Sequence, residues 1–280
     1  KELFFMSPAE QLAITSMCEA IKDDAQLADD LAAAAGAVED DEDEGEEDDA
    51  PKKKSKKKGL PKKMLSELRD RVLITKATAA DIAMFGRMVA TSPRHNWEAA
   101  VQVAHAITTH RDEAEDDFYT AVDDLKKPSE DAGAGFIGEL GFGSGVFYLY
   151  ACIDRALLQK NLGGNKDLAA LSIAGLVEGL ATASPSGKQA SFAARSRASH
   201  LRIEKGSQQP RSLAAAFFKP LRGDDLLAVS VAELDKLATG MNKAYGPCFD
   251  GAPYVMDVGA GKGSLAEAIT GADVRLLRAR

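Results

Sequence analysis

The feature that most limits how this chain folds is a block of charge between residues 39 and 58. Glu39–Asp49 carries ten acidic residues and Lys52–Lys58 carries six lysines, with no apolar periodicity. Such a segment cannot bury enough apolar surface to offset the entropy lost on ordering it. We therefore predict a disordered, solvent-exposed insertion at 38–60. Its lysines could contact a phosphate backbone or act as a sorting signal, but the adjacent acids compete for them.

Bulk composition fits a folded, cytoplasmic protein. The chain has 280 residues, of which 45% are hydrophobic, enough for one large domain or two small ones. We expect neither a membrane span nor a signal peptide, because no apolar run approaches the roughly 18 residues that a span needs. The three cysteines lie far apart without a CxxC pair, which argues against a zinc ribbon and favours reduced thiols. The net charge of −8 does not by itself predict nucleic-acid binding.

Local patterns predict helices first and mixed elements later. Ser7, Pro8 and Glu10 form a helix start in which Ser7 caps, Pro8 takes the first turn and Glu10 completes a capping box. Further helices are expected at about 26–35, 61–73, 167–182, 213–218 and 226–245, and strands at 100–109, 145–153 and 188–203. The helix at 167–182 offers an apolar face that includes Leu171. This order is typical of an α+β fold rather than a regular βαβ repeat.

Two glycine-rich stretches interrupt these elements. Residues 126–143 are polar and end in spaced glycines, as in a hairpin or extended loop that leaves a sheet. Val255–Leu265 (VMDVGAGKGSL) is similar to the first motif of S-adenosylmethionine-dependent methyltransferases, in which glycines allow close approach of a cofactor. Only 17 residues follow Gly263. That is too few for the rest of a Rossmann-like sheet, so the methyltransferase stays the alternative function.

The histidines do not predict a metal centre. His105 and His110 are five residues apart, which puts them on opposite faces of a strand and makes them poor joint ligands. His105 shares a face with Val101, Val103 and Ile107 and is expected in the core. No metal and no cofactor are expected.

Six blocks resemble, in order and spacing, the CasC family, the backbone subunit of the type I-E CRISPR Cascade complex. Together they span about residues 81–225, half of the chain. A single block would be weak evidence, whereas six in order make a chance resemblance implausible. The blocks are GRMVATS (Gly86–Ser92), AHAITTHR (Ala104–Arg111), FYTAVDDL (Phe118–Leu125), SGVFYLYACI (Ser144–Ile153), LQKNLGG (Leu158–Gly164) and ATASPSGKQASFAA (Ala181–Ala194).

The resemblance implies a fold built like a hand. The palm is a modified RNA-recognition-motif (ferredoxin-like) sheet, the fingers are helical, and the thumb is a β-hairpin. On this template the fingers take residues 1–80 with the insertion at 38–60, the palm takes 81–246 with the thumb at about 126–143, and 247–280 form a Gly-rich C-terminal tail. The family's basic opening segment has no counterpart here, so we expect the chain to be N-terminally truncated.

The resemblance also implies a function in antiviral defence. Copies of the subunit would wrap one CRISPR RNA (crRNA) as a helical filament, kink the guide at intervals and present it for pairing with target DNA. The implied partners are CRISPR RNA, further copies of the chain, other Cascade subunits, and target DNA through the guide. The protein would be part of a ribonucleoprotein complex and not an enzyme.

Eight residues are expected to contact RNA. Met88 and Tyr119 match the family positions that pack on the flipped base, since a thioether fills irregular gaps and a ring stacks on any base. From the residues alone, both would be core side chains. Phe118 is the alternative aromatic and should face the other way along its strand. The candidates for phosphate or ribose contact, each of which could instead be an ordinary surface group, are Arg87, Lys188, Gln189, Lys219 and Arg222.

Overall fold

A computed structural model describes residues 6–22, 73, 79–89, 93–112, 114–121 and 136–276. Within these residues the protein is a mixed α/β structure whose strands form small two-stranded sheets. The chain divides into one unit of residues 1–101 and 153–172, and a second of 102–152 and 173–280. The predicted helix at 26–35, the charged insertion at 38–60 and nearly all of the predicted helix at 61–73 lie outside the described residues.

The first unit begins with α1 (Pro8–Lys22), and its predicted capping box is confirmed. The Ser7 amide donates to Glu10 Oε2 at 2.8 Å, and the Glu10 amide donates to Ser7 Oγ at 3.2 Å. The unit continues with α4 (Ala80–Phe85), the 3₁₀ turn η1 (Pro93–His95) and α5 (Arg155–Asn161). The buried Asn161 amide donates to Ala83 O at 3.0 Å and Glu98 O at 2.9 Å. These two bonds fix α5 against α4 and against the segment after η1, which explains why residues 153–172 belong with the N-terminal segment.

The predicted helix at 167–182 is present as α6 (Lys166–Thr182), but its buried face differs from the expected one. Leu171 is 63% exposed. Of the predicted apolar face only Val177 is buried, and the other buried residues of the helix are mainly small: Ala169, Ala170, Ser172, Ile173, Ala174 and Ala181. Small side chains let a helix approach its neighbours closely, so the bulkiest residue does not have to mark the inner face.

Three pairs of strands follow one another along 101–121 and 136–153. β1 (Val101–Val103) pairs with β6 (Ala151–Ile153), β2 (Ile107–Thr108) with β5 (Phe147–Tyr148), and β3 (Glu115–Ala121) with β4 (Phe136–Phe142). The predicted strands at 100–109 and 145–153 are therefore present, each broken in two. Thr108 faces Phe147 and Glu115 faces Phe142, so residues 109–114 oppose only 143–146. The register therefore changes between the β2–β5 pair and the β3–β4 pair, which form separate two-stranded sheets.

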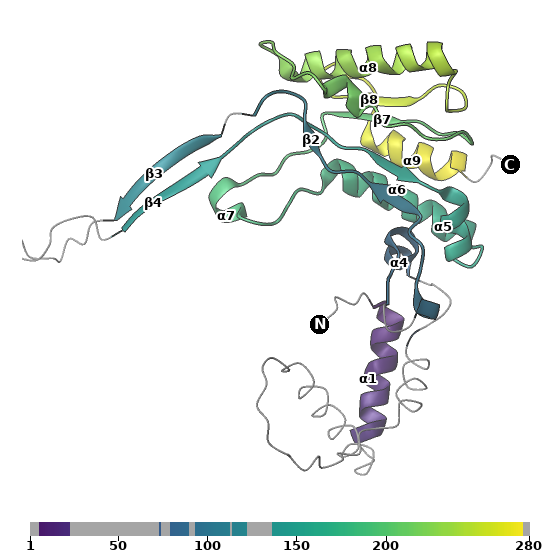
Figure 1. Cartoon of the computed structure of the whole chain (residues 1–280). Coiled ribbons are helices and arrows are strands. Elements are labelled where there is room, and N and C mark those ends of the chain that lie inside the picture. Colours follow the sequence, from purple (N-terminus) through teal and green to yellow (C-terminus); the bar gives the residue numbers. More distant parts are fainter. Residues whose placement is uncertain are drawn as a thin grey trace, which may run out of the picture. The chain divides into compact units, whose positions relative to one another are not determined.

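The hairpin of β3 and β4 extends away from the helices of the second unit (Figure 1). It begins earlier than the predicted thumb at 126–143, because Glu115–Ala121 forms its first strand. Of the predicted thumb, residues 126–135 lie outside the described residues. Phe118 and Tyr119 thus belong to this hairpin.

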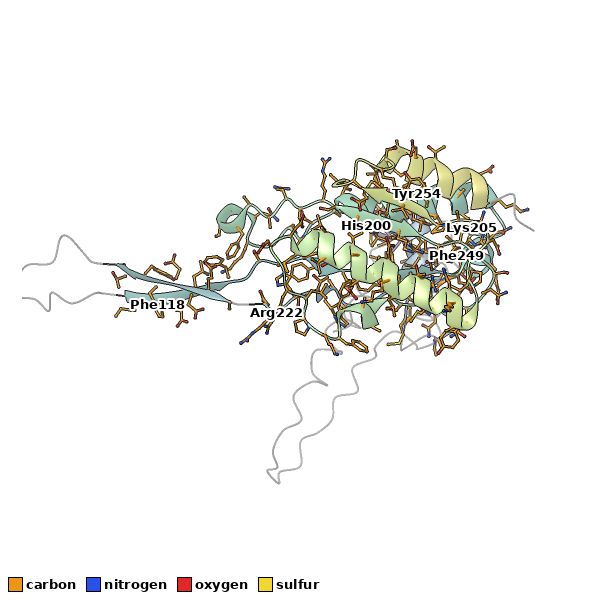
Figure 2. The ribbon with its side chains drawn as sticks, turned by 90° about the horizontal axis from the view of Figure 1, so that it is seen from above. Phe118, His200, Lys205, Arg222, Phe249 and Tyr254 are labelled. Carbon is orange, nitrogen blue, oxygen red and sulfur yellow. The ribbon has the colours of Figure 1, made fainter. Side chains whose placement is uncertain are left out.

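The rest of the second unit is built on β7 (His200–Ile203) and β8 (Tyr254–Asp257), an antiparallel pair that lies between α8 (Leu226–Tyr245) and α9 (Leu265–Leu276) in Figures 1 and 2. The helix predicted at 226–245 is confirmed. The strand predicted at 188–203 is wrong for most of its length, since only its last four residues are extended and α7 (Gln189–Phe192) precedes them. The predicted tail at 247–280 contains β8 and α9.

The core of the second unit joins α8 to the 3₁₀ turn η2 (Ala214–Phe217), where a helix was predicted. Leu213 and Phe217 pack on Leu234 and Ala238, with Tyr148 of β5 at the edge of the cluster. A buried hydrogen bond of 2.8 Å from Ser230 Oγ to Thr109 Oγ1 joins α8 to the end of β2. The root of the hairpin is therefore held against the core.

Candidate nucleic-acid interface

The hairpin arm, defined as Glu115–Ala121 with Phe136–Phe142, displays an aromatic residue on each face. All seven residues of β3 are exposed, with Phe118 at 69% and Tyr119 at 49%. Phe118 faces Glu139 across the pair and Tyr119 faces Gly138. Neighbouring residues of a strand point to opposite faces, so the predicted divergence of Phe118 and Tyr119 is confirmed. The exposure of Tyr119 excludes the core alternative for this residue, and its cross-strand partner Gly138 has no side chain to cover the ring.

The described strands of this arm carry only negative charge. Their ionisable side chains near neutral pH are Glu115, Asp116, Asp117 and Glu139, all exposed. Carboxylates at these positions repel phosphate. The arm is therefore suited to contact bases through its rings and is unsuited to hold a nucleic-acid backbone by charge.

Positive charge lies at the root of the arm, in the basic loop, defined as residues 218–222. Leu221 fixes this loop, because its amide donates to Thr109 O at 3.1 Å and it bridges to His110. Lys219 and Arg222 on either side are exposed, and neither forms an ion pair with any residue that the structure describes. Figure 2 shows Arg222 where the arm joins the helical part of the unit and Phe118 farther out. Exposed cations on the same body as exposed rings are the two kinds of group that single-stranded nucleic acid contacts, through phosphate and base respectively.

Arg87, predicted to contact phosphate, is instead buried in the first unit. Its Nη1 lies 2.8 Å from Glu10 Oε1 and 2.9 Å from Glu10 Oε2, with side-chain exposures of 1% and 2% for the two partners. Burial alone would raise the pKa of Glu10, but hydrogen bonds from the Ser7 amide and from Arg87 bring it below its usual value. The guanidinium is therefore committed to an internal carboxylate.

The Met88 side chain is exposed because the residues on either side of it are held in place. The Arg87 amide and carbonyl both bond to Trp97, at 3.0 and 2.8 Å, and Val89 is buried. In this extended segment the side chains alternate, which leaves Met88 77% exposed. Exposure excludes the core alternative for Met88. Met88 belongs to the first unit and Tyr119 to the second.

Lys188 and Gln189 lie at the start of α7. Lys188 adopts φ +53°, an unusual left-handed conformation for a residue with a side chain, and its Nζ lies 5.8 Å from the centre of the Phe192 ring. Gln189 Nε2 donates to Pro185 O and Ala194 O. The Gln189 amide thus closes its own loop rather than being displayed for ribose, whereas Lys188 is exposed.

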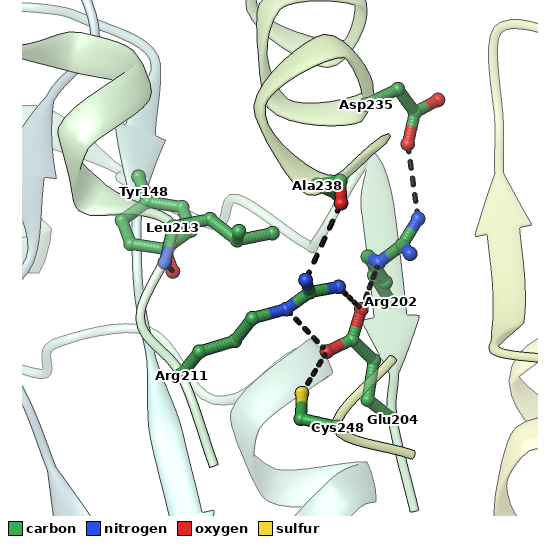
Figure 3. Close-up of polar contacts among 8 residues, drawn as sticks. All are labelled: Tyr148, Arg202, Glu204, Arg211, Leu213, Asp235, Ala238 and Cys248. Atoms are coloured by element: carbon green, nitrogen blue, oxygen red, sulfur yellow. Dashed lines mark hydrogen bonds and ion pairs between the residues drawn. The ribbon is translucent and has the colours of Figure 1, made fainter. Parts of the chain in front are cut away.

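Two further arginines of the second unit are neutralised. Figure 3 shows Glu204 between Arg202 Nε at 2.8 Å and Arg211 Nη2 at 2.9 Å, with Cys248 Sγ at 3.7 Å. Burial would raise the pKa of Glu204, but the two guanidinium groups bring it below its usual value. Burial raises the pKa of the Cys248 thiol, which keeps it protonated. This cluster joins β7 to α8 and to the segment after α8, and is structural.

The histidines also differ from expectation. His105, predicted in the core, is exposed because the strand breaks between β1 and β2. His110 Nε2 accepts from the Val146 amide at 3.1 Å, so Nδ1 carries the proton and donates to Arg111 O at 2.8 Å. His110 therefore closes the root of the arm. Among the described residues, no group of three or more His, Cys, Asp or Glu side chains is arranged to hold a metal.

The Gly-rich motif forms a closed turn. Asp257 and Lys262 exchange two backbone hydrogen bonds of 2.8 and 2.9 Å, and Asp257 Oδ1 accepts from the Ala260 amide at 2.9 Å. A Cβ on Gly263 would lie 2.6 Å from Val255 O, so the glycine serves close packing of the turn on β8. β8 is antiparallel to β7, whereas a methyltransferase motif follows a parallel strand. The structure gives the alternative function no support.

The second unit carries two of the predicted groups, the rings on the arm and the cations Lys219 and Arg222 in the loop at its root. The sequence reasoning missed Phe218, which is 80% exposed beside Lys219. The Phe-Phe pair at 217–218 gave the available signal, because only one of two neighbouring large rings can point into a small core.

Comparison with known proteins identifies the family. A model of the CT1975-like protein family of Cas proteins matches residues 1–271. Two chains of solved structures described as a CRISPR RNA-guided surveillance complex are similar. One, in a pre-nicking state, has a TM-score of 0.61 and 27% identity over 87% of this chain and 66% of its own. The other has a TM-score of 0.56 and 28% identity over 69% of this chain and 78% of its own.

This chain thus spans just under two thirds of the first of these relatives. No curated protein sequence matches it. In the part that the structure describes, every helix is too short or too polar to cross a membrane. The family match and the two structural matches agree with the resemblance to a Cascade backbone subunit. The chain belongs to the CT1975-like family of CRISPR-associated proteins.

Proposed function

We propose that this protein is a guide-RNA-binding backbone subunit of a type I-E Cascade surveillance complex. In this role, several copies coat one CRISPR RNA, and each hairpin arm acts as the thumb that displaces a base at a regular interval. The observation that carries the proposal is the pairing of an exposed two-faced aromatic arm with two uncompensated cations at its root. The solved relatives are named as parts of CRISPR RNA-guided complexes, which supports RNA as the ligand.

The charges of these residues indicate which part of the RNA each would contact. Lys219 and Arg222 attract the phosphate backbone to the root of the arm, where the attraction is independent of sequence. Phe118 and Tyr119 then stack on bases, again without reading their identity. A protein that must coat any spacer needs these two sequence-tolerant interactions. No reaction is required of any of these residues, so we propose a structural role rather than an enzymatic one.

The remaining features complete the proposal. The second unit, with its short antiparallel pairs, would serve as the palm, a modified RNA-recognition fold, and α1 would belong to the helical fingers. Met88, displayed by the Arg87–Val89 segment, would contact the guide from the first unit. Assembly with other Cascade subunits would place the guide for pairing with target DNA.

The test is recovery of RNA with the protein. The full chain is expressed with the other subunits and a guide, the complex is purified, and the bound RNA is probed with nuclease. We expect a short RNA with periodic cleavage. The double variant Phe118→Ala, Tyr119→Ala should retain RNA but lose the periodicity, whereas the control Tyr245→Ala, exposed at the end of α8, should not change it. Absence of RNA, or an unchanged pattern in the double variant, contradicts the proposal.

A further inference from the structure

Phe218 carries an exposed ring on a fixed backbone. It is 80% exposed, whereas Phe217 beside it is 8% exposed. The Phe217 ring packs on Tyr148 with centroids 5.3 Å apart, within the core that η2 forms with α8. The two neighbouring rings therefore have opposite roles: Phe217 anchors the backbone, and Phe218 is turned away from that core.

The backbone that carries Phe218 is fixed on both sides. Phe218 itself is helical, with φ −63° and ψ −24°, and closes η2. Pro220 restricts the next part of the loop, and the amide of Leu221 donates to Thr109 O at 3.1 Å. A ring on a fixed backbone leaves only its own side-chain torsions to be ordered when a ligand covers it. Such a ring is better suited to binding than one on a mobile segment.

The charges beside this ring indicate what covers it. Lys219 and Arg222 are exposed and lack ion-pair partners among the described residues. Of the two acids that follow, Asp225 is occupied by capping α8, because its Oδ1 accepts from the Ala228 amide at 2.9 Å. Asp224 is exposed beside the loop and offsets part of its charge. A single ring flanked by two cations is complementary to one nucleotide, with a flat base and a phosphate on either side.

We propose that Phe218 stacks on a nucleobase at the root of the hairpin arm, with Lys219 and Arg222 on the adjoining phosphates. The proposal rests on the proposed function and extends it, because it adds a base contact outside the arm. The competing occupant is the acidic arm of a second copy, which also complements two cations. We favour RNA because the loop offers one ring among exposed polar and proline residues, rather than the continuous apolar surface that a protein partner buries.

A photo-crosslink distinguishes the two occupants directly. Phe218 is replaced by p-benzoylphenylalanine in the full chain, which is mixed with radiolabelled single-stranded oligouridine RNA and irradiated. We expect a crosslink to RNA. The control carries the same photo-reactive residue in place of Tyr245, which is 88% exposed on α8, and should give far less crosslinked RNA. A crosslink from position 218 to a second protein chain, or no crosslink, overturns the proposal.

Affinity provides a second, independent measurement. Loss of one stacked base predicts about 5- to 150-fold weaker binding of a short single-stranded RNA by Phe218→Ala. Phe218→Trp should retain or improve binding, since any large ring can stack, and Tyr245→Ala should bind as the unsubstituted chain does. If the unsubstituted chain binds RNA and Phe218→Ala binds equally well, this inference fails while the proposed function stands. If the unsubstituted chain binds no RNA, both fail.

Discussion

Replacing Glu10 by alanine should destabilise the first unit strongly. Glu10 is 1% exposed and holds both the capping box of α1 and the guanidinium of Arg87. Removing one partner of a buried ion pair leaves the other charge buried without compensation, which costs about 3–5 kcal/mol. Loss of the cap interaction adds about 1 kcal/mol. The expected total of about 4–6 kcal/mol is a large part of the stability of an ordinary domain.

The chain contains its own reporter for this experiment. Trp97 is the only tryptophan, and its backbone exchanges two hydrogen bonds with Arg87. Urea unfolding followed by Trp97 fluorescence therefore reports the segment that Glu10 supports. The double variant Glu10→Leu, Arg87→Met removes both charges and should recover most of the loss, because an apolar pair can replace a buried ion pair.

A matched control uses an ion pair at the surface. Lys236 Nζ lies 2.9 Å from Glu233 Oε1, with side chains 74% and 36% exposed. Glu233→Ala should cost less than about 1 kcal/mol, measured by circular dichroism in the same urea series. If Glu10→Ala cost no more than this, or if the double variant were no more stable than Glu10→Ala, the buried ion pair would not be what holds the segment.

The same contact predicts a dependence on pH. The folded pKa of Glu10 lies below the ordinary value of 4.5, so its contribution is fully present above that value and is lost as the pH falls through the folded pKa. Stability reported by Trp97 should therefore decrease below about pH 4.5. Glu10→Gln, which cannot ionise, should be less stable at neutral pH and lose less on acidification. Parallel pH profiles for the two proteins would contradict this assignment.

Three further outcomes are expected. The double variant Lys219→Ala, Arg222→Ala should bind RNA more weakly. The slope of log K against log salt concentration should become shallower by about 1.4, since each phosphate contact to a single strand contributes about 0.7. An unchanged slope would show that these cations stay in solvent. Replacing 115–142 by a short Gly-Ser linker should leave the thermal unfolding of the second unit nearly unchanged, because β3 is exposed throughout, yet abolish periodic RNA protection. Gly263→Ala should destabilise the β8 turn, because φ is +66° and the new Cβ would lie 2.6 Å from Val255 O; equal melting temperatures would contradict this.

The elements that sequence predicted well are those fixed by local chemistry. Ser7, Pro8 and Glu10 define a helix start wherever it occurs, and Asp225 with the apolar spacing after it defines α8. The stacking candidates of the arm were identified only through the resemblance of FYTAVDDL to a family block, because the residues alone placed Tyr119 in the core. Opposite faces for Phe118 and Tyr119 follow from the alternation of any strand.

The features that sequence could not provide depend on contacts between distant segments. Arg87 is buried because Glu10, far from it in sequence, supplies a carboxylate, and no local pattern reveals that pair. His105 is exposed because the strand is interrupted at 104–106, which its β-branched neighbours do not indicate. Gln189 closes its own loop through carbonyls on both sides. In each case the sequence identified a polar side chain, but it did not reveal the surroundings that the fold gives to that side chain.

The acidity of the hairpin arm has a consequence before any RNA is bound. A two-stranded hairpin has two open edges whose backbone groups can pair with strands of another chain, which is a route to aggregation. Charged side chains oppose such pairing, and Glu115, Asp116, Asp117 and Glu139 distribute four carboxylates along these two strands. Free copies therefore repel one another through their arms. The same carboxylates that make the arm a poor phosphate ligand thus help to keep unassembled chains from adding edge to edge.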